Sequence, residues 1–341
     1  MVLSNRHSDD SIPFLIVISV SQTNNGDKPA RDWSELPHEL IAIVADGLGI
    51  IDLLSFRGVC KDWNIASRTA SAEIESSPSR EPWFLLYGES SQCLLLSESG
   101  KKYTINIPKL NNGGATCIGS NNGWLLILQQ NSIFFFCPFS DAKIDLPKLP
   151  SSEFSDYAAS FSSPPTSKDC IVSVLCQNNT SDMELYLLRR GGNNWTTHKH
   201  RCPHERPPKK IKCAVYCEDE FHFLDDADKL VTFSVKDFQW KIFRIISQDK
   251  PGVESIPYYM RKNSFKTKCM KQQLGLGDDV SISICGTAVL AIAHPKTERI
   301  IFGELINPPQ PQESEARSLK GVWIQPRFFY VPADQSWYAS S

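Results

Sequence analysis

Residues 32–63 read DWSELPHELIAIVADGLGIIDLLSFRGVCKDW, and this stretch decides how the N-terminal part of the chain folds. Its proline, Pro37, suits the start of a helix, because the first helical position needs no backbone N–H and the fixed φ of proline already fits. Apolar residues then recur at intervals of four, three, one and four, which is one face of a helix. They are Leu36, Leu40, Ile43, Val44 and Leu48. The pattern predicts an amphipathic helix.

Two more short helices are predicted behind the first one. Gly47 and Gly49 end the first helix, and Asp52 suits the cap of a second. Apolar residues continue at helical spacing up to Trp63. So small a unit buries too little surface to be very stable alone, and we expect part of its apolar face to pack on a partner or on the rest of the chain. An ordinary helical hairpin whose apolar residues are all core is the simpler alternative.

The order of these residues strongly resembles the F-box, from residue 32 to about residue 66. The resemblance rests on a Leu-Pro followed by Glu-Leu, an Asp-Leu-Leu, and then Arg-x-Val-Cys-x-x-Trp. In that family the module docks on a Skp-type adaptor, which links it to a cullin–RING ubiquitin ligase. Many members carry Arg where this chain has Asn64. Matched by position, the resemblance implies adaptor contacts at Leu36, Pro37, Leu40, Ile43, Leu48, Leu53, Val59 and Trp63.

Composition indicates one small module and one large globular domain. The chain has 341 residues, 41% of them hydrophobic, which is ample for a packed core. A net charge of −2 gives no overall basic field, so we expect neither a nucleic acid nor a membrane surface as partner. Eleven scattered cysteines favour reduced thiols, and therefore the cytoplasm and/or the nucleus. The apolar run 12–20 is far shorter than the roughly 20 residues that cross a bilayer.

The remainder of the chain is predicted to be β structure. We divide the whole chain into an extension and linker (1–31), the F-box (32–70), a second linker (71–82) and a large domain (83–341). Short runs rich in branched and aromatic residues, separated by turn residues, predict strands. The runs are 83–88, 92–97, 102–107, 123–130, 132–137, 170–176, 183–190, 195–200, 210–217, 220–225, 229–235 and 239–245, with two or three more within 275–306.

Tightly joined strands in fours are typical of propeller blades, which repeat about every 40–45 residues. We therefore predict a small all-α F-box module followed by a predominantly all-β domain, a β-propeller of about six blades. A β-sandwich is the second choice, because it would leave much of the length unused.

Two segments add a resemblance within the β domain. GSNNGWLLIL (119–128) and CPFSDAKIDLPKLP (137–150) look like paired signatures of the plant F-box family with a KIB-type β-propeller. Cys137 stands where that family usually has Asn, and Asp141 where it usually has Gly. A cysteine side chain hydrogen-bonds to its own backbone poorly, so we expect Cys137 in place of Asn to loosen a turn. The resemblance weakens after residue 245, which leaves the closure of the ring open.

A zinc site is the one metal site that the spacing suggests. Two of its possible ligands, Cys213 and Cys217, lie four apart on a predicted strand and so about 13 Å apart, too far for one ion. We therefore predict no metal and no cofactor, and a polar loop with buried thiols instead. The possible ligands are His198, His200, Cys202, His204, Cys213 and Cys217.

Basic runs at 198–212 and 261–271 are typical of solvated loops, with a nuclear-import signal or a patch for an acidic partner as the alternative.

No catalytic motif is complete. His38-Glu39 begins like H-E-x-x-H, but Ala42 stands at the second histidine. We predict a non-catalytic substrate receptor of an SCF-type ubiquitin ligase, with an unknown protein substrate on the propeller. The weak C-terminal third suggests an alternative, an adaptor-binding decoy or regulatory interaction protein that delivers no substrate. A propeller enzyme is the third hypothesis, for which the sequence offers only Asp225, Asp226 and Asp228.

Overall fold

The computed structural model describes 36–68, 70, 83–88, 90–97, 101–110, 114–130, 132–150, 156–177, 183–201, 211–217, 219–225, 229–244, 259–260, 281–284, 292–293, 318–329, 331 and 336–338. Three predicted features therefore lie outside the described residues: the N-terminal extension, the second linker and the basic run 261–271. The same holds for Cys202, His204, Asp226 and Asp228. No helix in the described part of the chain is long and apolar enough to span a membrane.

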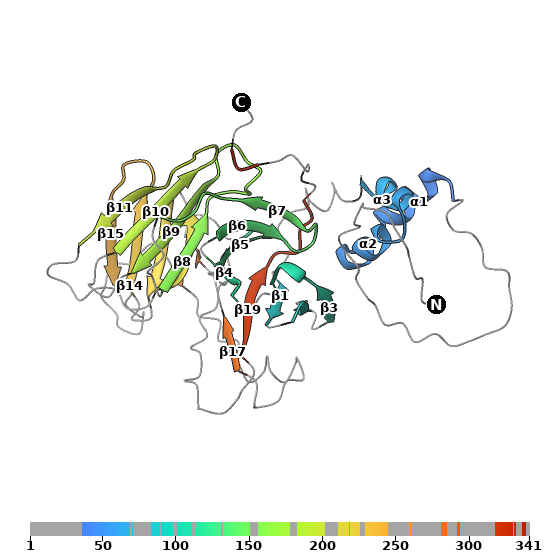
Figure 1. Cartoon of the computed structure of the whole chain (residues 1–341), viewed down its shortest axis with the longest axis horizontal. Coiled ribbons are helices and arrows are strands. Elements are labelled where there is room, and N and C mark those ends of the chain that lie inside the picture. Colours follow the sequence, from blue (N-terminus) through green and yellow to red (C-terminus); the bar gives the residue numbers. More distant parts are fainter. Residues whose placement is uncertain are drawn as a thin grey trace.

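Three short helices form the N-terminal module, as predicted (Figure 1). Pro37 is the N-cap of the first, and Gly47 follows its last residue. The second helix is capped by Gly49 and not by Asp52, which lies in its first turn. Gly49 suffices because its extended backbone turns the chain into the helix without a side-chain hydrogen bond. The helices are α1 (His38–Asp46), α2 (Ile50–Arg57) and α3 (Lys61–Ala66).

Four large sheets follow. Three of them have four antiparallel strands in an up-and-down order, and the first has five strands, two of which come from the C-terminal part of the chain. The first contains β1 (Trp83–Tyr87), β2 (Gln92–Leu96) and β3 (Lys102–Asn106), and the short 3-10 helix η2 (Pro108–Leu110) follows it. The second contains β4 (Thr116–Asn121), β5 (Trp124–Gln129), β6 (Ser132–Cys137) and β7 (Ala142–Asp145). The third contains β8 (Asp156–Phe161), β9 (Ile171–Gln177), β10 (Met183–Arg189) and β11 (Thr196–His200). The fourth contains β12 (Ile211–Cys217), β13 (Glu220–Asp225), β14 (Lys229–Ser234) and β15 (Trp240–Arg244).

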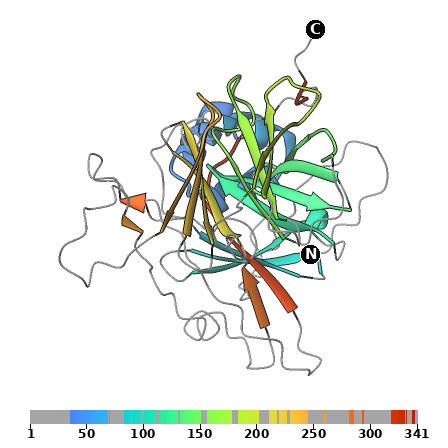
Figure 2. The same cartoon turned by 90° about the vertical axis from the view of Figure 1, so that its left-hand side faces the viewer.

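The sheets are propeller blades, because the strand that begins each one contacts its counterpart in the next. Strand β4 contacts β8, and β8 contacts β12. Figure 2 shows the sheets fanned around a common centre. The predicted strands are present in these blades, whereas β4, β7 and β8 were not predicted. The all-β propeller prediction is thereby confirmed.

The first blade is completed by the C-terminal strand β19 (Ser318–Ile324), which was also not predicted. It pairs antiparallel with β1 from Trp83↔Ile324 to Tyr87↔Lys320 and contacts β4. Strands from the two ends of the domain thus pair within one blade. This pairing joins the two ends of the described part of the ring. Strand β17 (Ser281–Ile284) adds a parallel neighbour to β19, while β16 (Tyr259–Met260) and β18 (Ile292–Ala293) form a separate pair. The count of about six blades stays a prediction.

The larger hydrophobic core runs from the helices through the first three blades and includes the described C-terminal residues 325–329 and 336–338, here called the C-terminal segment, at Phe328, Phe329 and Trp337. Phe135 packs at ring-centroid distances of 4.8 Å from Phe161 and 5.8 Å from Trp337, both of which are fully buried. Trp124 lies 5.4 Å from Phe329. The C-terminal segment is therefore part of the propeller core.

Candidate functional site

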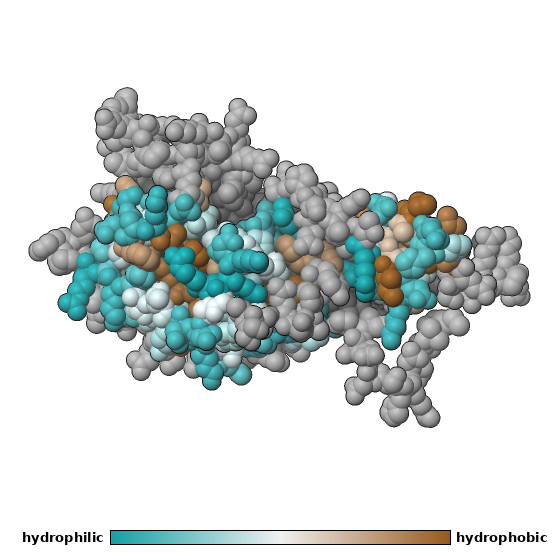
Figure 3. All heavy atoms as spheres, turned by 90° about the horizontal axis from the view of Figure 1, so that it is seen from above, coloured by the Kyte–Doolittle hydropathy of each residue, from teal (hydrophilic) through white to brown (hydrophobic). Residues whose placement is uncertain are grey.

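In the helical module, α1 does not bury the apolar face that its sequence pattern suggests. It buries the opposite face. Ile41 and Ala45 point inward. Because residues 40, 43 and 44 lie away from 41 and 45 on a helix, the middle of the predicted apolar stripe faces outward, whereas Leu36 and Leu48 at its ends pack inward. Brown side chains are accordingly visible on the helical part, at the right of Figure 3. The large apolar side chains exposed on this module are Leu40 (49%), Ile43 (66%), Val44 (50%), Val59 (58%) and Ile65 (46%).

The predicted adaptor contacts fall into two groups in the structure. Pro37, Leu40, Ile43 and Val59 are exposed. Leu36, Leu48 and Trp63 are half-buried and pack against the core of the helices. Adaptor contact by these residues stays a prediction.

Leu53, also predicted as a contact, is only 1% exposed and belongs to the hydrophobic core in this structure. Val44 and Ile65 are exposed residues that the prediction omitted. Their signal was apolar character at helical spacing beside Ile43 and Trp63.

The module is joined to the propeller through α2. The Arg57 guanidinium lies 4.1 Å from the ring centre of Phe328 in the C-terminal segment. Arg57 Nη2 also donates to Asn64 Oδ1 at 3.4 Å, and Asn64 Nδ2 donates to the Arg57 carbonyl at 3.4 Å. Asn64, the departure from the usual F-box pattern, therefore belongs to the network that holds Arg57 against the C-terminal segment.

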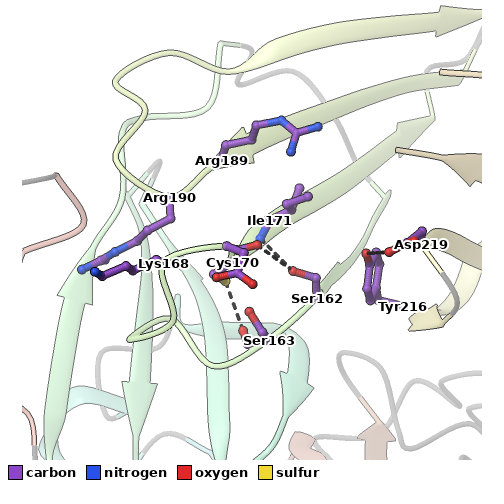
Figure 4. Close-up of a pocket in the computed structure, with 10 residues that line it drawn as sticks. Ser162, Ser163, Lys168, Cys170, Ile171, Arg189, Arg190, Tyr216 and Asp219 are labelled. Atoms are coloured by element: carbon purple, nitrogen blue, oxygen red, sulfur yellow. Dashed lines mark hydrogen bonds between the residues drawn. The ribbon is translucent and has the colours of Figure 1, made fainter. Parts of the chain in front are cut away.

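A second candidate site is a pocket of about 450 Å³ between the third and fourth blades (Figure 4). Burial raises the pKa of the Cys170 thiol to about 12, so this sulfur is not a thiolate at neutral pH. Burial, and then the hydrogen bond to Asp219, raises the pKa of Tyr216 to about 12. Both groups are therefore protonated and uncharged at neutral pH.

The histidines considered for zinc lie among aromatic rings. His198 stacks on Phe238 at 5.3 Å, and His200 lies 5.4 Å from Trp240. Burial lowers the pKa of His198, which favours the neutral imidazole. Within the described ranges, no group of three or more His, Cys, Asp or Glu side chains is arranged to hold a metal ion.

The segment 119–125 lies where the second blade meets its neighbours and the C-terminal segment. Gly123 has a φ of 81°, and a Cβ there would lie 2.8 Å from Arg327 Cβ. Ser120 Oγ donates to the Trp323 carbonyl at 2.8 Å. A Cβ on Gly119 would lie 2.8 Å from the Ala159 carbonyl oxygen of the third blade. The Gly-Ser-x-x-Gly-Trp-Leu pattern therefore encodes close packing around the inner strands.

Family models match both parts of the chain. The model described as KIB1-4 beta-propeller matches residues 93–282, more than half of the chain, and the F-box domain model matches residues 33–71. The chain belongs to the plant F-box proteins with a KIB1-4 beta-propeller. The family model thus begins within the first blade and includes the pocket between the third and fourth blades.

Similar curated proteins come from Arabidopsis thaliana. One F-box/kelch-repeat protein is 32% identical over 180 residues, which cover 51% of this chain and 48% of the relative. Another is 24% identical over 266 residues, which cover 71% of this chain and 66% of the relative. The chain thus spans about half to two thirds of the length of these relatives.

Among solved structures, the WD40 domain of SCAP from fission yeast is 8% identical with a TM-score of 0.30, over 69% of this chain and 58% of that one. An identity and a TM-score this low support no conclusion about the fold or the function of this chain.

Proposed function

We propose that this F-box and propeller protein is the substrate-recognition subunit of an SCF-type cullin–RING ubiquitin ligase. The observation that carries the proposal is the outward-facing apolar row on α1 and α3, on a module that matches the F-box. Exposed apolar side chains on so small a unit are typical of an interaction site. A Skp-type adaptor is the partner that the F-box family suggests.

The role of such a receptor is proximity. Its propeller holds a protein whose lysine is then modified by other subunits, so the receptor raises the effective concentration of that lysine near the ubiquitin-loaded enzyme. The cytoplasm and/or the nucleus is the compartment we propose, because Cys60, Cys93, Cys137, Cys170 and Cys176 carry free thiols.

Adaptor capture tests the proposal. We expect full-length wild-type protein to retain a plant Skp-type adaptor, and Ile43→Glu to weaken retention by at least about tenfold, because a charge then faces an apolar partner. Ile43 is 66% exposed, so the substitution leaves the helical core intact. The matched control is Phe243→Glu, which alters an exposed apolar residue on β15 of the fourth blade.

Equal adaptor retention by wild type and Ile43→Glu would refute the docking surface. In plant cells, proteins bound to the propeller should accumulate when Ile43→Glu replaces wild type. Adaptor binding without any such accumulation favours the alternative, a decoy or regulatory interaction protein. That alternative was suggested by the weak C-terminal third, but β19 in fact completes a blade, so the C-terminal end contributes to the propeller.

A further inference from the structure

The pocket between the third and fourth blades has a rim held in place by hydrogen bonds. The Ile171 amide donates to Ser162 Oγ, and the Arg190 amide donates to the Cys170 carbonyl, both at 2.8 Å. These bonds tie the β8–β9 loop to its own blade and to the β10–β11 turn. A preformed pocket of about 450 Å³ is large enough for a side chain and the backbone next to it.

Among the described residues that line this pocket, cations outnumber carboxylates. The cations are Lys168, Arg189 and Arg190, and the carboxylates are Asp169 and Asp219. The carboxylates have other partners, because Tyr216 donates to Asp219 at 3.0 Å and Ser167 donates to Asp169 at 3.3 Å.

None of the three cations forms an ion pair with a residue that the structure describes. Elsewhere on the described blades, lysines do pair with carboxylates: Lys109 with Asp141, Lys143 with Asp145, Lys199 with Glu184, and Lys241 with Glu220. The three cations therefore have no ion-pair partner among the described residues that an external anion would have to displace.

The Arg190 side chain is held in position by its contact with Trp337. Its guanidinium carbon lies 5.1 Å from the ring centre of the buried Trp337, and the Gly191 amide donates to the Trp337 carbonyl at 3.1 Å. Its Nη1 atom is buried and has no hydrogen-bond partner among the described residues. In Figure 4 the side chains of Lys168 and Arg190 extend to the same side of the pocket. Two cations held on neighbouring loops suit an anion with several acceptor oxygens.

We propose that this pocket binds a phosphorylated side chain of a protein partner. A phosphate group carries nearly two negative charges and three acceptor oxygens, so it satisfies donors from both loops where a carboxylate satisfies fewer. That the partner is a ubiquitination substrate rests on the proposed function, whereas the binding itself does not.

A peptide-binding experiment tests the pocket. The probe is a peptide library with phosphoserine fixed at its centre and mixed residues around it, beside matched libraries with serine or glutamate at the centre. We expect full-length protein to retain the phosphoserine library at least about tenfold better than the serine library, with glutamate between them. Added salt should weaken retention, because the attraction is electrostatic.

Two double variants test whether the phosphoserine peptides bind in the pocket. Lys168→Ala with Arg189→Ala should lower retention of the phosphoserine library by at least about tenfold, and both side chains are exposed, so the fold is kept. The control is Lys148→Ala with Lys236→Ala, which removes two exposed cations outside the pocket. Arg190 is left unchanged because it packs on Trp337.

Equal retention of the serine and phosphoserine libraries would overturn the inference. So would equal losses in the pocket variant and the control variant, which would indicate general attraction to basic surface. Both variants are also tested for capture of the Skp-type adaptor, which the pocket substitutions should leave unchanged. Phosphopeptide binding without adaptor capture would refute the ligase role alone, and adaptor capture without phosphopeptide binding would refute the pocket alone.

Discussion

At the scale of single residues, Asp141 shows how a departure from a family pattern is accommodated. Its φ of 56° lies in the left-handed region, which is why glycine suits this position. Lys109 Nζ donates to both the carbonyl oxygen (2.9 Å) and Oδ1 (2.8 Å) of Asp141, and so holds the aspartate in this conformation. The neighbouring change, Cys137, was expected to loosen the turn. The Ser140 amide nevertheless donates to its carbonyl at 3.3 Å and closes the turn.

Substitutions at Asp141 separate backbone strain from the ion pair. Asp141→Ala removes the carboxylate and keeps the left-handed backbone, whereas Asp141→Gly removes both the carboxylate and the strain. We expect the alanine variant to be less stable than the glycine variant by about 1 kcal/mol. Urea unfolding of the two proteins measures the difference, and equal midpoints would show that the left-handed backbone at this position costs nothing.

At the scale of elements, the outer hairpin of the third blade carries an ionic contact between a largely covered carboxylate and an exposed lysine. Glu184 on β10 faces Lys199 on β11, with Oε1 and Nζ 2.7 Å apart. Tyr186 donates to Glu184 Oε2 at 2.6 Å. The hydrogen bond from Lys199, and then that from Tyr186, lower the pKa of Glu184. Because the ionised carboxylate is favoured in the folded state, this contact stabilises the hairpin.

Stability should therefore depend on pH through Glu184. A carboxyl with a lowered folded-state pKa stabilises the protein above its ordinary pKa, and this contribution is lost as the pH falls through the folded-state value. We expect Glu184→Gln to be less stable than wild type at neutral pH, with the difference shrinking in acid. Urea unfolding across pH checks this. Asp145→Asn is the control, because its ion pair with Lys143 is largely exposed and should contribute little.

Elements with branched and aromatic residues were predictable, and most strands nearest the propeller centre were not. Strands β5, β6 and β13 are rich in Leu, Ile and Phe and were found from the sequence. Strands β4, β8 and β19 were missed because they carry small residues, including Gly119, Ala159 and Gly321. Those residues are small because neighbouring groups crowd them, as the Phe84 ring crowds Gly321. Crowding of this kind depends on the fold and leaves no periodic pattern.

The candidate sites were predictable to different degrees. The order of the F-box residues in the sequence located the helices. Which apolar residues face outward depends on how α1 packs on α3, and this packing cannot be read from the sequence. The cationic pocket was not predicted, because Lys168, Arg189 and Tyr216 come from three different loops and strand ends.

At the scale of the whole molecule, β19 closes the first blade and is followed by the segment that contacts both the helices and the core. Val322 and Ile324 are buried, and Trp337 is fully buried. We expect a chain that stops before Ser318 to lose cooperative unfolding and to aggregate, because β1 then has an unpaired edge. Thermal unfolding and size-exclusion chromatography check this. A chain that stops after Tyr338 is the control, and the inference fails if both truncated chains unfold alike.

The pairing of β1 with β19 also fixes an order of events during protein synthesis. The F-box helices and the first three strands leave the ribosome more than two hundred residues before their last partner strand is made. Until then β1 carries an open edge that is prone to the wrong partner, and only the synthesis of β19 removes it. We therefore expect the nascent chain to be exposed to chaperones and proteases from the synthesis of β1 to that of β19, and a codon change that slows the ribosome within residues 245–317 should prolong that exposure.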